Sequence, residues 1–306
     1  MKIITGQDVL NLKISPLDAF EWVREVFCRK RLSNLPPKIS MKSDDHRFYN
    51  TMPCELPYMN VFGVKEVNRY PGRKPSLDSK MLLYDLKTGK CKALLDANEI
   101  TAMRTGAVAA LAVEIFAVSG YETLGVVGLG EMAHSTMRVL LARRRLNHLG
   151  KLIVNLYRYK DQAEKFAEEF TGDDLEYRLF DSMEELIRNS QVVLSCVTYV
   201  DGTFAPDSAF QHGCTIIPVH TRGFQNCDLF FDKIYADDEG HVSGFQYFKQ
   251  FRYFAELGDV INRTAEGRKN DLERILSYNI GIAAHDVYFA QKIFERCDGA
   301  LEIEMT

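Results

Sequence analysis

The chain has 306 residues, of which 46% are hydrophobic and 26% charged, and its formal net charge is -4. This length is about twice that of an ordinary domain, and the composition is typical of a globular protein, which excludes a small single module and a disordered chain. The mildly negative charge argues against nucleic acid as a partner. We therefore expect two domains and a small-molecule partner.

The cysteines and the apolar runs indicate the cellular setting. No CxxC pair occurs, and no histidine stands at ligand spacing beside a cysteine, so neither a zinc site nor a disulfide framework is expected. The longest apolar runs are too short and too interrupted to cross a bilayer, and the N-terminus lacks a signal-peptide pattern. We expect a cytoplasmic protein with reduced thiols, no bound metal and no membrane partner. The cysteines are Cys28, Cys54, Cys91, Cys196, Cys214, Cys227 and Cys297.

The first hundred residues predict a mixed α+β region. Ser15 and Pro16 precede an amphipathic pattern that runs to Leu32, which predicts an N-capped helix. Strand patterns follow, and Asp85 to Gly89 has the composition of a hairpin turn. The predicted strands are FYNTMP from residue 48, MNVFGVKEV from 59, KMLLYDL from 80 and KALLD from 92.

From residue 97 to 117 the apolar residues recur at helical spacing, and Ser119 and Gly120 close that helix. Beyond it, short apolar strands alternate with helices, which predicts a doubly wound parallel sheet, a Rossmann domain, over residues 118–274. The predicted strands are TLGVVG, KLIVNLY, LEYRLF, QVVLSCVT, CTIIPV and KIYADD, and the helices are 131–146, 161–170 and 182–189.

The C-terminal tail predicts one long amphipathic helix after a break at Gly281. Its apolar stripe needs a partner surface, which we place on the first domain. The expected architecture is therefore α/β: a Rossmann domain plus a discontinuous α+β substrate and dimerisation domain of residues 1–117 and 275–306.

The strongest local motif is a GxGxxA turn that follows a strand and opens a helix. Gly128 would make the tight turn, Gly130 would let the backbone approach a pyrophosphate, and Ala133 would allow close packing of helix and strand. Glu131 and Met132 begin the helix whose N–H groups would bind the phosphates. Glycine-rich turns also serve plain chain reversal, but this context predicts dinucleotide binding.

The second strand of the Rossmann pattern indicates which dinucleotide is bound. An NAD-selective site usually ends this strand with an acidic residue, whereas KLIVNLY is followed by Arg158, Tyr159 and Lys160. Arg158 and Lys160 could pair with a 2′-phosphate, and Arg158 could stack on adenine. We expect NADP(H) to be preferred and NAD(H) to be possible. The alternative is a solvated basic loop.

These motifs resemble the ornithine cyclodeaminase and mu-crystallin family over most of the chain. The ITAMRTGAVAA stretch places Arg104 39 residues after Lys65, a spacing that is fairly specific. The other matching segments are GVKEVN from Gly63, LLYDLKTGK, the Gly128 turn, ELGDVI from Glu256, GRK from Gly267 and GIAAHD from Gly281.

The resemblance implies a homodimer whose split domain presents a substrate pocket to the nicotinamide. It implies redox chemistry at the Cα–N bond of a small imino or amino acid, as in ketimine reductases and amino-acid dehydrogenases. Lys65 and Arg104 match the family's carboxylate-binding cations, and a Lys also holds or donates a proton. Two alternatives stay open: Lys65 could snorkel, and Arg104 could tether its helix through Asp96 or Glu99.

Other positions match the family less closely. Ser79 and Thr198 match residues on the cofactor side, although hydroxyls at such positions are often ordinary strand-end groups. We also place Gly281 on the cofactor side. Lys38 and Arg47 lie where a further carboxylate-binding arginine is expected, and Lys38 is the candidate we retain.

The main departure from the family follows the strand CTIIPV. Cyclodeaminases carry an acid/base Asp there, whereas this chain has His220 and Arg222, and a guanidinium takes up no proton near neutral pH. His220 could act as the acid/base, because its ordinary pKa lies in the useful range, or it could be structural. Arg222 could bind a second carboxylate of an acidic substrate.

Three functions remain in consideration from the sequence. The first is an NADPH-dependent reductase or dehydrogenase at a C=N or CH–NH bond beside a carboxylate, with Lys65, Arg104 and His220 as catalytic residues. The second is a cyclodeaminase-type lyase that releases ammonia and keeps its cofactor tightly bound; the missing Asp argues against it. The third is a non-catalytic, crystallin-like binder of NADPH, which the presence of both cations disfavours.

Overall fold

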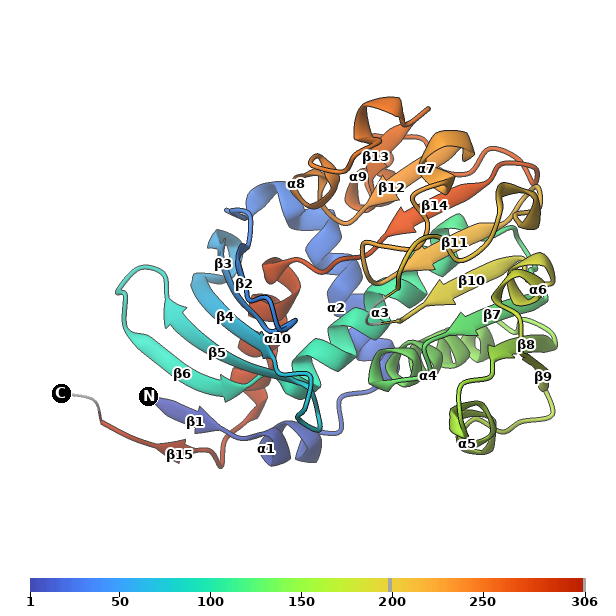
Figure 1. The fold of residues 1–306 in the computed structure, drawn as a ribbon. Helices are drawn as coiled ribbons and strands as arrows, with labels where there is room; N and C mark the ends of the chain where they lie inside the picture. Colours follow the sequence, from blue (N-terminus) through green and yellow to red (C-terminus); the bar gives the residue numbers. More distant parts are fainter. Residues whose placement is uncertain (198–199, 305–306) are drawn as a thin grey trace. The chain divides into compact units, whose positions relative to one another are not determined.

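The computed structural model describes residues 1–197 and 200–304. Its contacts divide the chain into two compact units, Met1–Arg104 with Ile282–Thr306 (unit 1) and Thr105–Gly281 (unit 2). The first boundary lies inside the long helix α3 (Asn98–Phe116) and not after it at residue 117, as predicted, and the second lies after Gly281 and not after residue 274. Both termini belong to unit 1, so this unit is discontinuous in sequence (Figure 1).

Unit 1 is built on a seven-stranded sheet of order β15-β1-β6-β5-β4-β3-β2. The two ends of the chain pair at one edge of it, where Lys2 lies opposite Glu302. Strands β1, β2 and β15 were not predicted from the sequence, because they are short and lie outside the repeating strand patterns of the chain. The strands are β1 (Lys2–Ile4), β2 (Ile39–Lys42), β3 (Phe48–Leu56), β4 (Val61–Arg69), β5 (Leu77–Asp85), β6 (Cys91–Asp96) and β15 (Leu301–Glu302).

Helices α1 (Gly6–Asn11), α2 (Pro16–Arg29) and α10 (Ala283–Arg296) complete unit 1. The Ser15 side chain accepts a hydrogen bond from the Asp18 N–H at 3.0 Å, which is the predicted N-cap of α2. Helix α10 packs across β3, β4 and β5 and against α2, where Trp22 meets Phe289 edge to face at 5.0 Å. The tail helix therefore covers the sheet of the first hundred residues.

The two faces of this sheet differ in burial. On β4 the buried side chains are those of Val61, Lys65 and Val67, and they alternate with Phe62 and Val64, which are half-buried on the opposite face. Because successive side chains of a strand point to opposite faces, Lys65 comes from the face of the sheet that is buried. A lysine that is buried in this way needs a partner of opposite charge.

Unit 2 contains an eight-stranded sheet of order β13-β12-β14-β11-β10-β7-β8-β9 in which every described pairing is parallel (Figure 1). This confirms the predicted doubly wound class. The strands are β7 (Thr123–Val127), β8 (Leu152–Tyr157), β9 (Leu175–Phe180), β10 (Val192–Ser195), β11 (Thr215–Pro218), β12 (Lys233–Ala236), β13 (Phe254–Glu256) and β14 (Ile275–Tyr278).

The described part of unit 2 contains six further α-helices, and the first three agree with the predicted ranges to within a residue at each end. Strands β13 and β14 were not predicted; β14 enters the sheet between β11 and β12, and β13 lies at the edge beside β12. The helices are α4 (Glu131–Leu146), α5 (Gln162–Glu169), α6 (Met183–Arg188), α7 (Cys227–Phe230), α8 (Glu239–Val242) and α9 (Leu257–Ile261).

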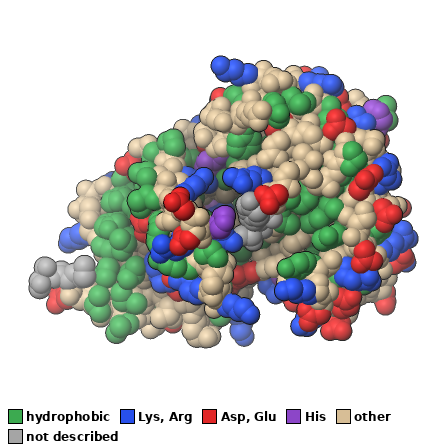
Figure 2. All heavy atoms as spheres, in the orientation of Figure 1, with side chains coloured by type: hydrophobic (Ala, Val, Ile, Leu, Met, Phe, Trp, Pro, Cys, Tyr) green, Lys and Arg blue, Asp and Glu red, His purple; other side chains and the backbone are tan. Residues whose placement is uncertain are grey.

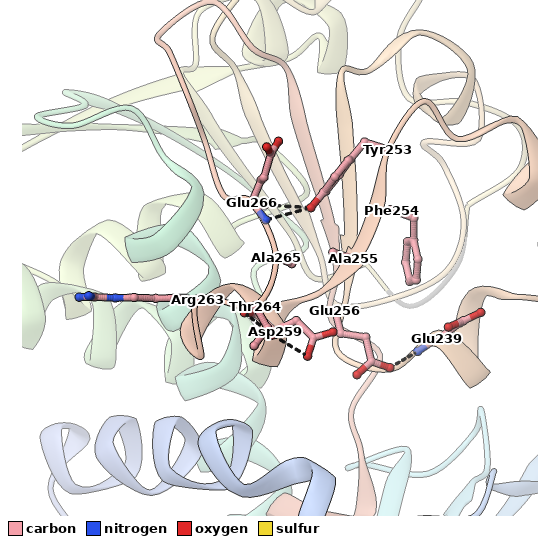
Figure 3. A pocket seen from close by; sticks show the side chains of 10 residues that line it. All are labelled: Glu239, Tyr253, Phe254, Ala255, Glu256, Asp259, Arg263, Thr264, Ala265 and Glu266. Carbon is pink, nitrogen blue, oxygen red and sulfur yellow. Dashed lines mark hydrogen bonds between the residues drawn. The ribbon is translucent and has the colours of Figure 1, made fainter.

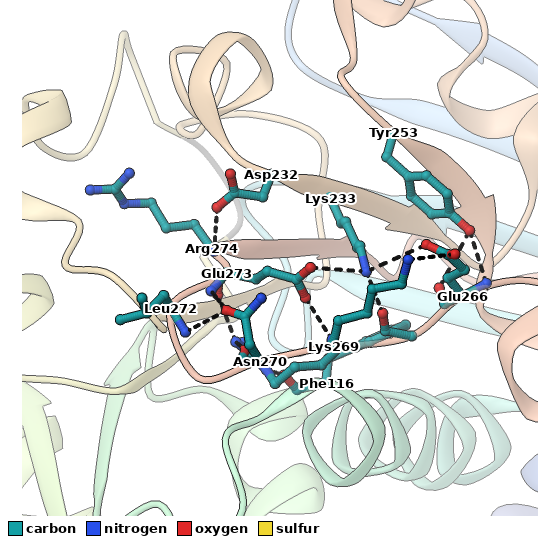
Figure 4. Close-up of polar contacts among 12 residues, drawn as sticks. Phe116, Asp232, Lys233, Tyr253, Glu266, Lys269, Asn270, Leu272, Glu273 and Arg274 are labelled. Carbon is teal, nitrogen blue, oxygen red and sulfur yellow. Dashed lines mark hydrogen bonds and ion pairs between the residues drawn. The ribbon is translucent and has the colours of Figure 1, made fainter.

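The Gly267-Arg268-Lys269 segment has a structural role in unit 2. The Arg268 guanidinium donates to the carbonyls of Phe116, Gly213, Asn270 and Glu273 and to the Thr215 hydroxyl at 2.6 to 3.1 Å. Beside it the buried Lys233 lies 3.1 Å from Glu273 and donates to the Gly267 carbonyl, as Figure 4 shows in part. These bonds join the end of α3 to β11 and β12.

Candidate active site

The glycine turn after β7 has the geometry that a dinucleotide-binding turn needs. Gly128 has a φ of +78°, a left-handed conformation that L side chains rarely adopt. A Cβ on Gly128 would also lie 2.7 Å from the Cys196 carbonyl carbon and from the Val197 nitrogen. Both the turn and the close approach of the neighbouring strand end therefore require glycine here.

Helix α4 begins directly after this turn, with Gly130 as its N-cap. A Cβ on Gly130 would meet no protein atom within 4 Å, so the space beside it is open. Glu131 is exposed, Met132 is half-buried and Ala133 is fully buried against the sheet. The open side of Gly130 lies at the N-terminus of a long helix, where backbone N–H groups favour an anion.

The turn lies at the topological switch point of the unit 2 sheet. Strand β7 has β8 on one side and β10 on the other, so the chain, having built β8 and β9 on one side of β7, crosses to the other side for β10 and β11. In open parallel sheets the crevice beyond the carboxyl ends of such strands is where ligands bind. The segments that reach this edge include the Gly128 turn, Arg158 after β8 and His220 after β11.

Arg158 is engaged in ion pairs at the surface. Its Nη1 donates to both carboxylate oxygens of Asp181, at 2.9 and 3.0 Å, and its Nε lies 3.5 Å from Glu164. Lys160 has a left-handed φ of 54° and its Nζ stands 5.3 Å from the centre of the Tyr159 ring. The end of β8 carries no carboxylate of its own, as predicted, but Asp181 at the end of β9 reaches Arg158.

His220 lies in a polar contact within unit 2. The Arg222 N–H donates to Nδ1 at 3.4 Å, so the proton belongs on Nε2, which donates to the fully buried Ser195 hydroxyl at 2.7 Å. Burial lowers the pKa of the His220 imidazole to about 4. The ring is therefore neutral at pH 7, and the ordinary pKa assumed in the sequence analysis was wrong. The Arg222 side chain is exposed.

Three other predicted cofactor residues have different positions. Thr198 lies outside the described residues. Gly281 has a φ of 95°, and its N–H donates to the buried Asp237 carboxylate, which fixes the end of unit 2. Ser79 belongs to unit 1, where it is buried on β5 with its Oγ 3.4 Å from the Thr101 hydroxyl on α3.

In unit 1 the two predicted carboxylate-binding cations converge on one acid. Lys65 Nζ donates to Oδ1 of Asp286 at 2.8 Å, and Arg104 Nε donates to the same oxygen at 3.1 Å. The exposed fractions are 1% for Lys65, 6% for Arg104 and 0% for Asp286. Strand β4, helix α3 and the first turn of α10 thus bring three charges together inside the unit.

Burial and mutual charge set the pKa values in this cluster. Burial lowers the pKa of Lys65 from 10.5 to about 8; Asp286 opposes the shift, and the positive charges of Arg104 and Lys38 favour it. Burial alone would raise the pKa of Asp286, but Arg104 and Lys65 outweigh it and hold that pKa below 3.8. Lys65 therefore titrates near physiological pH while Asp286 stays ionised.

The contacts of Lys65 and Arg104 exclude the two structural alternatives that the sequence left open for them. A buried Lys65 cannot snorkel to water, and Arg104 contacts Asp286 rather than Asp96 or Glu99. Lys38 lies close enough for its charge to act on Lys65. Arg47, in contrast, pairs with Asp45 at the tip of the β2–β3 hairpin.

Asp286 is the residue of this cluster whose role the sequence analysis missed. It is 221 positions from Lys65 in sequence, so no local pattern connects the two. The available signal was an acidic residue in a helix that is otherwise largely apolar, because carboxylates are rarely fully buried unless they are paired.

A separate cavity of unit 2, of about 580 Å³, has the wrong charge for phosphates. It is lined by Glu239, Glu256, Asp259 and Glu266, with Arg263 as its one basic residue among the described lining, and Figure 3 shows Glu256 turned toward Glu239. Within the described ranges, no group of three His, Cys, Asp or Glu side chains is placed to hold a metal ion. In that same part of the chain, no helix is both long and apolar enough to span a membrane.

The comparisons with known proteins agree with this architecture. The model of the ornithine cyclodeaminase/mu-crystallin family matches residues 2–300. Ketimine reductase mu-crystallin of Mus musculus is 30% identical over 264 residues, which cover 82% of this chain and 81% of that protein.

Two solved structures share the fold over nearly the full length. The Delta(1)-pyrroline-2-carboxylate reductase of Thermococcus litoralis, solved with NADH and L-proline, has a TM-score of 0.84 at 22% identity and covers 99% of this chain and 100% of its own. An archaeal alanine dehydrogenase dimer with bound NAD has a TM-score of 0.85 at 23% identity, with 100% and 99% covered. At these identities the likeness is one of fold.

Proposed function

Because the chain belongs to the ornithine cyclodeaminase/mu-crystallin family, we propose that it is an NADPH-dependent oxidoreductase of a small 2-imino or 2-amino acid, acting at the Cα–N bond. The observation that carries the proposal is the buried Lys65, Arg104 and Asp286 cluster. Two buried cations share a single carboxylate there, and Lys38 adds a third positive charge. The surplus positive charge suits an incoming carboxylate.

The residues of unit 2 fit a dinucleotide. Gly128 makes the turn, the open side of Gly130 leaves room for a pyrophosphate, and the α4 N-terminus supplies N–H donors. A bound nicotinamide dinucleotide supplies the hydride donor or acceptor of the reaction. The chain's own contribution at this site is to bind and orient that group.

The residues of unit 1 would bind the substrate carboxylate. The contact of Arg104 with Asp286 uses Nε, so the two terminal guanidinium nitrogens are not part of that contact. Those two nitrogens form the fork that matches a carboxylate, and Lys65 adds a second cation. Arg222 remains our candidate for a second carboxylate, should the substrate carry one.

Lys65 would also move the proton at the substrate nitrogen. A pKa of about 8 leaves it protonated at pH 7 and able to donate, whereas His220 is neutral there and already bonded to Ser195. We therefore assign the acid/base role to Lys65 and treat His220 as a residue that supports the end of β11.

A substrate panel tests the proposed function. NADPH absorbance at 340 nm is followed with cyclic imino acids and with 2-oxo acids plus ammonia or amines, and at least one carboxylate-bearing imine is expected to oxidise NADPH. Ammonia release from a diamino acid without net oxidation would favour the lyase instead. Tight NADPH binding with no turnover across the panel would favour the non-catalytic binder.

Cofactor preference gives a separate prediction. NADPH is expected to bind more tightly than NADH, and Arg158→Ala should narrow the difference by about 1 to 3 kcal/mol, the size of a charge-assisted hydrogen bond. The two solved structures described above hold NADH and NAD, so the prediction depends on Arg158 and Lys160 of this chain.

The matched control is Asp181→Asn, which removes the shorter of the two surface ion pairs of Arg158. Because such pairs are weak, the guanidinium exchanges partners readily, and this variant should bind NADPH at least as tightly as the wild type. Both affinities are measured by fluorescence titration. Equal affinity of the wild type for the two cofactors would refute the preference.

We also propose that the protein is a homodimer. The edge strand β2 exposes Ile39 by 63% and Met41 by 59%, and the outer face of the β4–β5 pair carries half-buried Phe62 stacked on Tyr84. Hydrophobic side chains gather over this sheet in Figure 2. An exposed edge and an apolar face both favour association. Light scattering should give twice the mass of the chain, and a monomer at micromolar concentration would contradict the proposal.

A further inference from the structure

The cluster in unit 1 contains one residue that the proposed reaction has not used. Asp286 lies in the first turn of α10, where the helix dipole favours a negative charge. It is completely buried, and a carboxylate in such a place is retained only if its surroundings stabilise its charge.

The contacts of Asp286 are concentrated on one oxygen. Oδ1 accepts from Lys65 Nζ at 2.8 Å and from Arg104 Nε at 3.1 Å, so one atom fixes the ends of two side chains that come from a strand and from another helix. Oδ2 is buried and has no hydrogen-bond partner among the described residues. A purely structural ion pair would be expected to satisfy both oxygens.

The balance of charge in the cluster also indicates that Asp286 has a role beyond a structural ion pair. The groups that act on Lys65 are Asp286 from α10, Arg104 from α3 and Lys38 from the segment before β2, and Asp286 also acts on the buried Cys54 thiol of β3. Among these groups Asp286 is the one anion. Without it, Lys65 would be a buried ammonium facing two other cations, a state that favours loss of its proton.

On the basis of the proposed function, we infer that Asp286 is a positioning residue of the carboxylate site. Its Oδ1 holds the Lys65 ammonium and the Nε edge of Arg104 together and keeps Lys65 charged, so that both cations are ready for the substrate carboxylate. Asp286 acts through these two residues and does not itself contact the substrate carboxylate, which it would repel.

The test is Asp286→Asn, which keeps the shape and the accepting oxygen but removes the charge. The pH dependence of kcat/KM is measured with the best substrate of the panel, and binding of pyrrole-2-carboxylate, a planar carboxylate, is measured over the same pH range. In the wild type both should decline above about pH 8, as Lys65 loses its proton. In the variant that decline should move down by at least about one pH unit, so the loss relative to the wild type is at least about fivefold at pH 8, at least about tenfold at pH 9, and much smaller near pH 6.

Two further variants separate the charge of Asp286 from a general structural effect. Asp228→Asn removes another buried carboxylate, one in unit 2 that accepts from the Tyr278 hydroxyl at 2.9 Å, and should leave the pH of the decline unchanged. Asp286→Glu keeps the charge. The pH at which kcat/KM and pyrrole-2-carboxylate binding decline should therefore stay within about half a pH unit of the wild type, even if kcat falls. This variant replaces Asp286→Asn if that variant does not fold.

The outcomes distinguish this inference from the proposed function. If the wild type neither binds pyrrole-2-carboxylate nor turns over any member of the panel, the proposed function fails. If the wild type is active and Asp286→Asn loses activity equally at every pH, or keeps the wild-type profile, the inference alone fails. A shift in Asp286→Glu as large as that in a folded Asp286→Asn would also overturn it, because the charge would then not be the cause.

Discussion

Replacement of Lys65 by alanine is expected to lower kcat by about 10²- to 10⁴-fold, the range that general acid catalysis contributes. The reason is that Lys65 is assigned two roles, one in holding the carboxylate and one in donating a proton in the transition state. Stopped-flow and steady-state assays with the best substrate of the panel measure the effect. NADPH affinity should stay within about twofold, because the phosphates are assigned to the glycine turn of unit 2.

Arg104→Lys is the companion variant, and it should affect mainly substrate affinity. A lysine keeps the charge but cannot bond Asp286 and also offer a fork, so KM should rise by about 10- to 100-fold, the equivalent of one charge-assisted hydrogen bond. The control for Lys65→Ala is Lys65→Met, which retains most of the side-chain volume. It is needed because loss of one member of a buried ion pair also lowers the stability of the protein. A folded Lys65→Ala protein with wild-type kcat and only a raised KM would reduce Lys65 to a binding group.

Gly128→Val is expected to produce the second large effect, a loss of NADPH binding. The position has a φ of +78°, and a Cβ there would stand 2.7 Å from the backbone after β10, so the turn must move. Strain of about 1 to 3 kcal/mol in the turn that binds phosphate corresponds to an affinity for NADPH that is weaker by about 5- to 150-fold. Isothermal titration with NADPH measures it.

Two glycines of unit 2 supply controls for this variant. Gly130→Ala adds a Cβ that meets no protein atom, so its thermal stability should match the wild type while NADPH affinity falls, because only the ligand would be crowded. Gly150→Ala, also in open space but after the end of α4, should change neither quantity. Unchanged NADPH affinity in both Gly128→Val and Gly130→Ala would place the dinucleotide elsewhere.

The sequence predicted the fold class well because its signals are local. Ser15 caps α2, the alternation of apolar strands with helices marks the parallel sheet, and the glycine turn stands between β7 and α4. Strand β14, Ile275 to Tyr278, is as long as the predicted strands β10 to β12, but it was missed because its segment was assigned to the C-terminal tail and not to the strand–helix alternation. Its place between β11 and β12 depends on tertiary packing, which no sequence pattern specifies.

The site was predicted in part for similar reasons. Lys65 and Arg104 were found through a resemblance, but their shared partner Asp286 is 182 residues from Arg104 and follows only from the packing of α10 on the sheet. The pKa of His220 could not be read from the chain, since its shift comes from burial. Likewise the pairing of Arg158 with Asp181 depends on the register of β8 and β9.

The most direct test of the central claim is the fate of the hydrogen at nicotinamide C4. The protein is incubated with NADPH that carries deuterium at both C4 positions and with the imine that the panel identifies, and the product is analysed by mass spectrometry and NMR. We predict one deuterium per product molecule, located at Cα, with NADPH consumed in equal amount. A product without deuterium at Cα, or ammonia release with no net consumption of NADPH, would contradict the account.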